Sequence, residues 1–434
     1  MNKRATWTSL FLVAVTTAWP TAWAAEPSTR PAGWQADAKA MAESERSRKT
    51  ILYREERVPA YTLPDVLTCA DGSRATTREQ WEQKRRPETL NLFASEVYGR
   101  HPAAPAKVTF NLVSTTPDAL EGKATHKRVK ITSTAADGKS FSFEASVMIP
   151  KAQAGSGKPA APVPAFLLIN NRGTKSADPS RQEKADFWPA ELIVARGYAA
   201  VVFNNGDVDP DDKADDARAK GVRGVWPAGG GTVGADAWGT IAAWAWGASR
   251  VMDYLQSDPA INAKQVAVIG HSRGGKTALW AGAQDERFAL TISNDSGEVG
   301  ASLARRRYGE TTAVINKAFP HWFCGNFKNY NDREETLPID QHQLIALMAG
   351  RAVCVGSADR DLWADPRGEF LSLAASSPAF ALYGEPGIKP DEMPPLDKPL
   401  DRGSRGYHVR SGTHNLTLVD WNRYMDFADK LWRK

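Results

Sequence analysis

The 434-residue chain is poor in cysteine and, beyond residue 24, has no long apolar run. Its three cysteines, Cys69, Cys324 and Cys354, are too few for a disulfide framework, and the odd number leaves at least one thiol unpaired within the chain. No later segment approaches the roughly 18 consecutive apolar residues of a membrane-spanning helix. Disulfide stapling and a membrane-embedded fold are therefore both excluded.

A large excess of one charge sign is also missing. The chain has 55 Lys and Arg against 50 Asp and Glu, a formal net charge of +5, and the two signs are interspersed. Nucleic-acid binding is therefore not indicated, whereas a locally basic cleft that attracts an acidic substrate is compatible with the sequence.

Metal-binding spacings are absent as well. An acidic cluster lacks the regular ligand and glycine spacing of a calcium loop, so we expect a solvated loop there and no metal. The cluster consists of Asp209, Asp211, Asp212, Asp215 and Asp216.

The first 24 residues have the order of an export signal. Lys3 and Arg4 precede an apolar segment, 7–19, that is too short to span a bilayer, and residues 22–24 end in a small-x-small cleavage pattern. We expect a mature chain that starts at Ala25, is periplasmic or secreted, and has no membrane attachment after cleavage. A buried N-terminal helix is the alternative, but the three parts of a signal occur in the right order.

The remaining chain is typical of one α/β catalytic domain, 103–434, preceded by an N-terminal extension, 25–102, that packs on it. The extension is polar, with a helix expected at 78–97. Period-2 patterns at 107–113, 128–132 and 141–149 predict half-buried antiparallel strands. Short apolar runs separated by helical patterns then predict βαβ units and a mostly parallel sheet. These runs lie at 165–169, 199–203, 266–269, 289–292 and 353–355.

Residues 270–276, Gly-His-Ser-Arg-Gly-Gly-Lys, hold the G-x-S-x-G spacing of a nucleophile elbow. The β-branched run before them is typical of a buried strand, and the segment after them reads as the start of a helix, which is the strand–turn–helix context that the motif requires. Glycines flank the serine because only they let neighbouring backbone pass so closely. We therefore predict Ser272 as a nucleophile rather than a surface serine in a structural turn.

A nucleophilic serine of this kind is followed in the chain by an acid and then a histidine. Of the downstream histidines, His414 falls in a loop after 406–410, which resembles the last strand of the sheet, and we favour it over His408 as the base. Two acids compete. Asp295 follows the strand after the elbow, and Asp361, with Asp359 beside it, follows the next strand. The sequence does not choose between Asp295 and Asp361.

The extended motif resembles the G-C-S-R-x-G-K signature of glucuronoyl esterases, carbohydrate esterase family 15. The likeness continues through 285–290, 294–297, 305–306, 309–310, 337–342 and 363–366, with Trp81, 85–88 and 98–100 upstream. The resemblance implies an α/β-hydrolase fold, a three-layer sandwich around the parallel sheet. It also implies a role for Arg273 in stabilising the oxyanion.

Further roles follow from the same resemblance. Lys276, Glu310 and Trp363 match family positions that contact the glucuronate, although singly each reads as a solvated lysine, a surface glutamate or a core tryptophan. Asp295 stands where the family usually has a longer glutamate. His271 and Asn415 stand where fungal members have a disulfide, so that disulfide is expected to be absent.

These features predict a serine esterase acting on the ester between glucuronic acid side chains of glucuronoxylan and lignin alcohols, without metal or organic cofactor. We expect a monomer with this lignin-carbohydrate ester as its partner, and neither nucleic acid nor membrane. An acetyl or feruloyl esterase is the alternative among enzymes; Lys276 and Glu310 argue against it, because an acetyl group needs no clamp for a sugar acid. A non-catalytic polysaccharide-binding protein is the alternative outside enzymes. A second oxyanion donor is expected from the loop 170–174, for which a plain turn is an equal alternative.

Overall fold

Ten strands form one sheet in this computed structural model, in the order β1-β2-β3-β5-β4-β6-β7-β8-β10-β9. The model describes residues 34–102, 104–151, 161–214, 216–226 and 234–433, so the expected signal segment lies outside the described residues. The strands are β1 Lys107–Ala119, β2 Ala124–Thr134, β3 Ser140–Pro150, β4 Val163–Asn170, β5 Ala199–Asn204, β6 Ile261–His271, β7 Leu290–Asn294, β8 Ala352–Ala358, β9 Pro399–Arg402 and β10 Arg405–Arg410. Strands β5, β4, β6, β7, β8 and β10 run parallel to one another.

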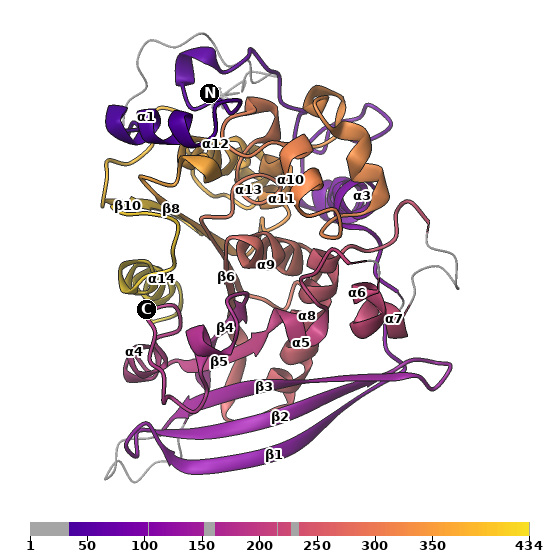
Figure 1. The fold of residues 1–434 in the computed structure, drawn as a ribbon, viewed down its shortest axis with the longest axis vertical. Coiled ribbons are helices and arrows are strands. Elements are labelled where there is room, and N and C mark those ends of the chain that lie inside the picture. The colour runs from indigo at the N-terminus through magenta and orange to yellow at the C-terminus, as the bar shows by residue number, and fades with distance from the viewer. Residues whose placement is uncertain (1–33, 103, 152–160, 215, 227–233, 434) are drawn as a thin grey trace, which may run out of the picture.

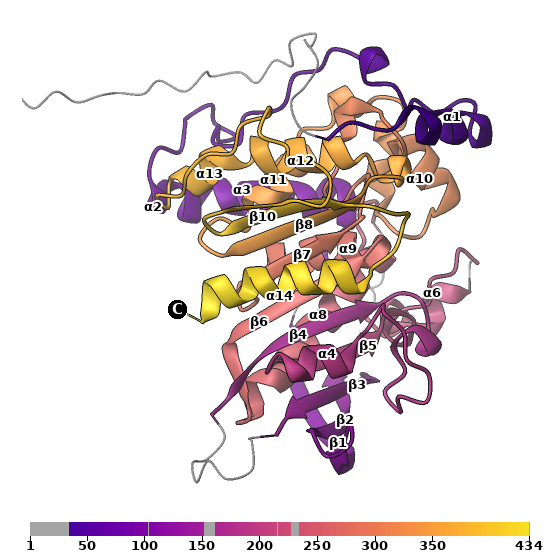
Figure 2. The same ribbon diagram turned by 90° about the vertical axis from the view of Figure 1, so that its left-hand side faces the viewer.

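The parallel part of the sheet is covered by helices on both faces, as Figures 1 and 2 show. One face carries α8 Thr240–Ser257, α9 Arg273–Gln284 and α12 Pro366–Ala375, and the other carries α4 Ala190–Ala195 and α14 Leu418–Trp432. Neighbouring strand residues point to opposite faces, so Leu167 joins the core under α8 and α9 while Leu168 joins the core under α14. The continuous apolar runs of the sequence are explained by this burial on both faces.

The strands and the long helix expected from the sequence are confirmed. Strands β1, β2 and β3 pair antiparallel and extend beyond the predicted ranges. The expected helix at 78–97 is helical from Arg78 to Tyr98, in α2 Arg78–Gln80 and α3 Arg86–Phe93 with π-helical turns at Trp81–Arg85 and Ala94–Tyr98. All three cysteines are free and buried, which agrees with the expectation that no disulfide framework holds this chain together and at least one thiol is unpaired.

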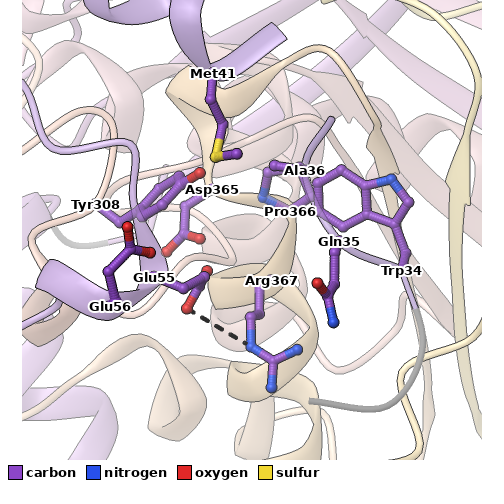
Figure 3. Close-up of a pocket in the computed structure, with 10 residues that line it drawn as sticks. All are labelled: Trp34, Gln35, Ala36, Met41, Glu55, Glu56, Tyr308, Asp365, Pro366 and Arg367. Atoms are coloured by element: carbon purple, nitrogen blue, oxygen red, sulfur yellow. Dashed lines mark ion pairs between the residues drawn. The ribbon is translucent and has the colours of Figure 1, made fainter. Parts of the chain in front are cut away.

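The N-terminal segment packs on the residues that follow β8, at the short helix η9 Leu362–Ala364 and the start of α12. Helix α1 Ala38–Ser47 packs on η9, and in Figure 1 it lies beside α12. Glu55 from the turn η1 Glu55–Arg57 accepts a hydrogen bond from Arg306 at 2.7 Å. A cavity of about 250 Å³ lies between this segment and the start of α12, with Trp34, Met41 and Glu55 facing Tyr308 and Arg367 (Figure 3).

Short helices fill the connections. They are η4 Thr174–Ala177, α5 Asn205–Val208, α6 Ala217–Lys220, α7 Val222–Val225, η6 Ala304–Arg306, α10 Thr312–Ala318, η7 Gly325–Tyr330, η8 Glu334–Thr336, α11 Gln341–Ala346 and α13 Ser377–Ala381. Within the described part of the chain, none of the helices has the length and apolar character needed to cross a membrane.

Candidate active site

Ser272 lies at a sharp turn between β6 and α9, with φ 57° and ψ −125°. This left-handed backbone is strained for a residue with a side chain. Its N–H donates to the Asn294 carbonyl at 2.9 Å, and its own carbonyl accepts from the N–H of Gly275 at 2.8 Å. A Cβ at Gly270 would lie 2.0 Å from the Gly274 carbonyl oxygen, so the elbow closes only because that position is glycine. The strand–turn–helix context predicted for this motif is confirmed.

His414 lies in the loop after β10. Its Nδ1 is 2.6 Å from Asp361 Oδ2, and its ring centroid is 4.4 Å from that of His271, the residue before Ser272. The side chain of His414 is 40% exposed, whereas that of Asp361 is 5% exposed. When Nδ1 donates to the carboxylate, Nε2 has its lone pair available, which is the tautomer that a general base needs.

Charged side chains hold the loop that carries His414 in place. Arg410, at the end of β10, donates to the carbonyl oxygens of Thr413, at 3.1 Å, and of Asn415. Asp359 accepts from the N–H of Gly412 at 2.7 Å, so this carboxylate orders the loop rather than the imidazole. His408 is 2% exposed and contacts Asp420 at 2.9 Å, which makes it part of the same buried support.

Asp295, directly after β7, is the second candidate acid and is 1% exposed. One carboxyl oxygen, Oδ2, accepts from the Asn415 N–H at 3.2 Å and from Arg410 at 3.3 Å. The other, Oδ1, has no hydrogen-bond partner among the described residues. Burial, together with the charge of Asp361, raises the pKa of Asp295 well above its ordinary value. Asp295 therefore holds a proton more readily than an ordinary aspartate, and a neutral carboxyl stabilises a charged imidazole less.

Asp295, Asp361 and His414 offer ligand atoms within 4.8 Å of one another, a grouping that a metal ion could also use. The Nδ1 atom of His414 is already engaged by Asp361 at 2.6 Å. A metal bound at Nδ1 would have to displace that hydrogen bond. The observed contact fits a histidine oriented by an acid. The expectation of no metal stays a prediction.

Arg273, the residue after the nucleophile, is held by Asp211 rather than facing solvent freely. Asp211 Oδ2 accepts from Arg273 NH1, and its Oδ1 accepts from the Trp322 indole N–H at 2.7 Å and contacts His321 Nε2 at 2.9 Å. The Arg273 guanidinium also stacks on the Trp322 ring at 4.7 Å. Hydrogen bonds from His321 and Trp322 and the charge of Arg273 outweigh burial and lower the pKa of Asp211 to about 2. A permanently charged carboxylate therefore fixes this guanidinium beside the elbow.

The solvated loop expected at the acidic cluster is wrong for two of its members. Asp209 is fully buried and pairs with Arg223 at 2.7 Å, and Asp211 holds Arg273. Asp212 and Asp216 are exposed, as expected, and Asp215 lies outside the described residues. The sequence reasoning failed because the basic partners of Asp209 and Asp211 follow 14 and 62 residues later in the chain.

Lys276, Glu310 and Trp363 lie together. Lys276 is 3% exposed, and its Nζ donates to the carbonyl oxygens of Ser296 at 2.5 Å and Glu298 at 2.6 Å and contacts Glu310 Oε2 at 3.5 Å. The Glu310 N–H donates to the Trp363 carbonyl at 3.0 Å. All three N–H donors of Lys276 thus have acceptors. A ligand hydroxyl could bind here by displacing one of these acceptors or by donating a hydrogen bond to Glu310.

Arg172, in the loop after β4, joins three parts of the site and was not singled out in the sequence. Its NH1 donates to Asn415 Oδ1 at 2.5 Å, and its NH2 donates to His271 Nε2 at 2.8 Å. The Nδ1 of His271 contacts Asn294 Oδ1 at 2.7 Å, so His271 is a neutral imidazole with its proton on Nδ1. Burial, with the charges of His414 and Arg172, keeps the pKa of His271 well below its ordinary value. The two positions expected to lack a disulfide are therefore bridged by a guanidinium.

Comparison with known proteins shows the family of this chain. The family model "Glucuronyl esterase, fungi" matches residues 131–384. Carbohydrate esterase MZ0003, from an unknown prokaryotic organism, is 40% identical over 408 residues, which cover 87% of this chain and 91% of that protein.

Solved structures extend the comparison. The glucuronoyl esterase from Solibacter usitatus is 42% identical with a TM-score of 0.79, and the match covers 87% of this chain and 100% of that chain. A mutant of the Sporotrichum thermophile enzyme, solved in complex with methyl 4-O-methyl-β-D-glucopyranuronate, is 25% identical with a TM-score of 0.60 over 85% of this chain and 86% of that one. From these matches, the chain belongs to the glucuronoyl esterases of carbohydrate esterase family 15 and has their α/β-hydrolase fold.

Proposed function

We propose that this protein is a carboxylic ester hydrolase that cleaves the ester between glucuronic acid side chains of glucuronoxylan and lignin alcohols. The observation that carries the proposal is the strained Ser272 elbow next to a histidine whose Nδ1 is 2.6 Å from a buried carboxylate. The relatives named as glucuronoyl esterases support the choice of acyl group.

In the proposed reaction, His414 Nε2 takes the proton of Ser272 Oγ as that oxygen attacks the carbonyl carbon of the uronic ester. The tetrahedral intermediate collapses, the bond to the alcohol oxygen breaks, and His414 gives the alcohol its proton. Water then attacks the acyl-enzyme, with His414 again taking a proton, and the glucuronate leaves as Ser272 regains its hydrogen. Asp361 stabilises the imidazolium that forms in each half of the reaction.

Arg273 supports the charge that develops on the carbonyl oxygen. Its backbone N–H opens α9, where the first N–H groups of a helix have no acceptor within the helix, and its guanidinium is held beside the elbow by Asp211. One well-placed donor to an oxyanion stabilises the transition state by roughly 3 kcal/mol. The loop after β4 supplies a further backbone donor in this proposal.

On the acyl side, Glu310 accepts from sugar hydroxyls and Trp363 offers an apolar face, while Lys276 orients Glu310 and shares a donor with the sugar. Glu310 is 7% exposed, so a hydrogen bond made there would be largely shielded from water.

We also propose that residues 1–24 form a cleaved export signal, that 25–102 is an extension of the catalytic domain 103–434, and that the protein acts as a monomer outside the cytoplasm. Contacts such as Arg306 with Glu55 tie the extension to the domain.

The test compares hydrolysis of benzyl glucuronate and p-nitrophenyl acetate by wild type and Ser272→Ala. We expect serine-dependent turnover that strongly favours the glucuronate ester. Turnover of the acetate alone would contradict the proposed acyl group, and retained turnover in Ser272→Ala, with its fold intact, would contradict the nucleophile.

A further inference from the structure

Tyr53, in the N-terminal extension, has a buried hydroxyl whose hydrogen has no acceptor among the described residues. The residue is 1% exposed, and its hydroxyl oxygen makes no hydrogen bond of regular geometry with them, although the N–H groups of Arg48 lie near enough to act on it as donors. A buried donor left without an acceptor costs stability, and phenylalanine would fill nearly the same space without that cost. The hydroxyl is therefore free to donate to a ligand.

The surroundings of this hydroxyl place it at the acyl side of the site. Burial raises the pKa of Tyr53, the charge and the N–H groups of the nearby Arg48 lower it, and the charges of Asp361 and Glu310 raise it further. Leu52, the residue before Tyr53, accepts at its carbonyl oxygen from the N–H of Gly309 at 2.9 Å. Gly309 directly precedes Glu310 in the chain. Tyr53 thus lies between the acid that orients His414 and the glutamate assigned to the sugar.

Two further contacts fix Tyr53 in this place. The Tyr308 hydroxyl donates to the Tyr53 carbonyl at 3.0 Å, and the two rings meet edge to face with centroids 6.0 Å apart. Tyr308 also lines the cavity drawn in Figure 3. Backbone and ring are therefore both anchored, and the hydroxyl is held in position rather than free to turn toward water.

Arg48, at the end of α1, lies over the face of Trp363 with its guanidinium carbon 4.1 Å from the ring centroid. Arg48 is exposed and forms no ion pair with a carboxylate among the described residues. A guanidinium stacked on an aromatic ring keeps its N–H groups in the plane around it, where they can donate to ligand oxygens. The extension thus brings a cation without a carboxylate partner to Trp363, the aromatic side chain assigned to the sugar.

We propose that Arg48 and Tyr53 complete the acyl pocket, with both side chains donating hydrogen bonds to ring hydroxyls of the bound uronic acid and so determining specificity for a sugar-acid acyl group. This inference rests on the proposed function. It makes the N-terminal extension part of the substrate site, not only a cover over the catalytic domain.

The two residues differ in what their removal does to the fold. Tyr53→Phe removes a hydroxyl whose hydrogen has no acceptor in the described chain, so the thermal midpoint should change little. Removal of a hydroxyl that donated to an acceptor in the protein would lower the midpoint. Arg48→Ala removes an exposed side chain, for which large stability changes are not expected.

The experiment measures KM and kcat for benzyl glucuronate, and turnover of p-nitrophenyl acetate, in wild type, Tyr53→Phe, Arg48→Ala, Arg48→Lys and Arg46→Ala. Arg46 is the matched control, because it is an exposed arginine on the same helix and loses the same charge. We expect KM for the glucuronate to rise about 10-fold in Arg48→Ala and about 3- to 10-fold in Tyr53→Phe, the effect of losing one or two hydrogen bonds. The lysine variant should lie between wild type and Arg48→Ala.

Acetate turnover and the Arg46→Ala variant should match wild type, because neither involves the sugar ring. Unchanged KM values in Arg48→Ala and Tyr53→Phe would overturn the inference while leaving the proposed function intact. Equal losses on both esters would also overturn it, since they would place the two residues in support of the catalytic groups instead. Failure of the wild type itself on the glucuronate ester would instead contradict the proposed function.

Discussion

Replacing each of the two candidate acids by asparagine separates their roles. Asp361 contacts His414 Nδ1 at 2.6 Å, whereas Asp295 faces Arg410 and the Asn415 N–H. Asparagine keeps the size of both side chains and leaves an oxygen for each existing donor. The substitution therefore changes mainly the charge, and we expect Asp361→Asn to lose far more activity than Asp295→Asn.

The size of the effect follows from Coulomb's law. A carboxylate and an imidazolium whose charges lie about 4 Å apart interact by roughly 4 kcal/mol at an effective dielectric constant of 20, which is about a thousandfold in rate. Burial and the charge of Asp361 raise the pKa of Asp295, which disfavours its charged form, so removing that charge should matter less. We expect kcat/KM to fall about 10³-fold in Asp361→Asn and less than about 10-fold in Asp295→Asn.

The assay is kcat/KM on benzyl glucuronate across pH, with thermal unfolding of each variant to confirm that the fold is intact. Asp359→Asn is the matched control, because Asp359 ends the same strand but accepts from the Gly412 N–H instead of the imidazole. It should stay within about 10-fold of wild type. A larger loss in Asp295→Asn than in Asp361→Asn would refute this reasoning and make Asp295 the main acid.

Three further predictions concern groups that hold the site. Asp211→Asn removes the charge that fixes Arg273 and should lower kcat by about 10-fold or more with little change in KM; a changed KM with constant kcat would contradict a role at the oxyanion. Arg172→Met should lower the free energy of unfolding in urea by about 2 to 3 kcal/mol, through lost hydrogen bonds to His271 and Asn415. Adding His271→Cys and Asn415→Cys to that variant should restore stability under oxidising conditions only, and equal stability with and without reductant would count against a bridge between these positions. Glu369, a fully buried residue of α12, accepts from the N–H groups of Ser296 and Gly297, which follow Asp295 in the chain, and from the Ser357 hydroxyl. Burial raises the pKa of Glu369 from 4.5 to about 8, so its contribution to stability is present below pH 4.5 and is lost as the pH rises through 8. The unfolding free energy of wild type minus that of Glu369→Gln should fall by up to roughly 4 to 5 kcal/mol across this window, and a constant difference would refute the shift.

The parts of the molecule that could be predicted from the sequence are those set by short-range patterns. The run before Gly270 is apolar on both faces because β6 is buried on both faces, and Gly270 is required by a backbone contact with Gly274, four residues later. The alternation at 141–149 reflects a strand, β3, that pairs antiparallel near the edge of the sheet. Local spacing is enough for such features, and the elbow and the strands were predicted for that reason.

The supporting contacts could not be predicted in this way, because their partners are distant in sequence. Asp211 reaches Arg273 across 62 residues, and Arg172 reaches Asn415 across 243. The pairing of His414 with Asp361 rather than Asp295 depends on a difference of a few ångströms between two strand ends. Tyr53 and Arg48 lie in a part of the polar extension to which the sequence analysis assigned no motif. Charge and composition are visible in the sequence, but the partner of each charge is not.

The topology nevertheless supplies a rule that spacing alone does not. In a parallel sheet the carboxyl ends of the strands meet at one edge, and polar residues shortly past these ends are candidates for the site. Each of the six parallel strands here is followed by one residue of the candidate site, namely Arg172 after β4, Asp211 after β5, Ser272 after β6, Asp295 after β7, Asp361 after β8 and His414 after β10. Applied to the predicted strands, this rule would have placed Asp211 near Ser272. A partly exposed ion pair between the two loops would then have been the natural expectation, because the elbow carries Arg273 directly beside the serine.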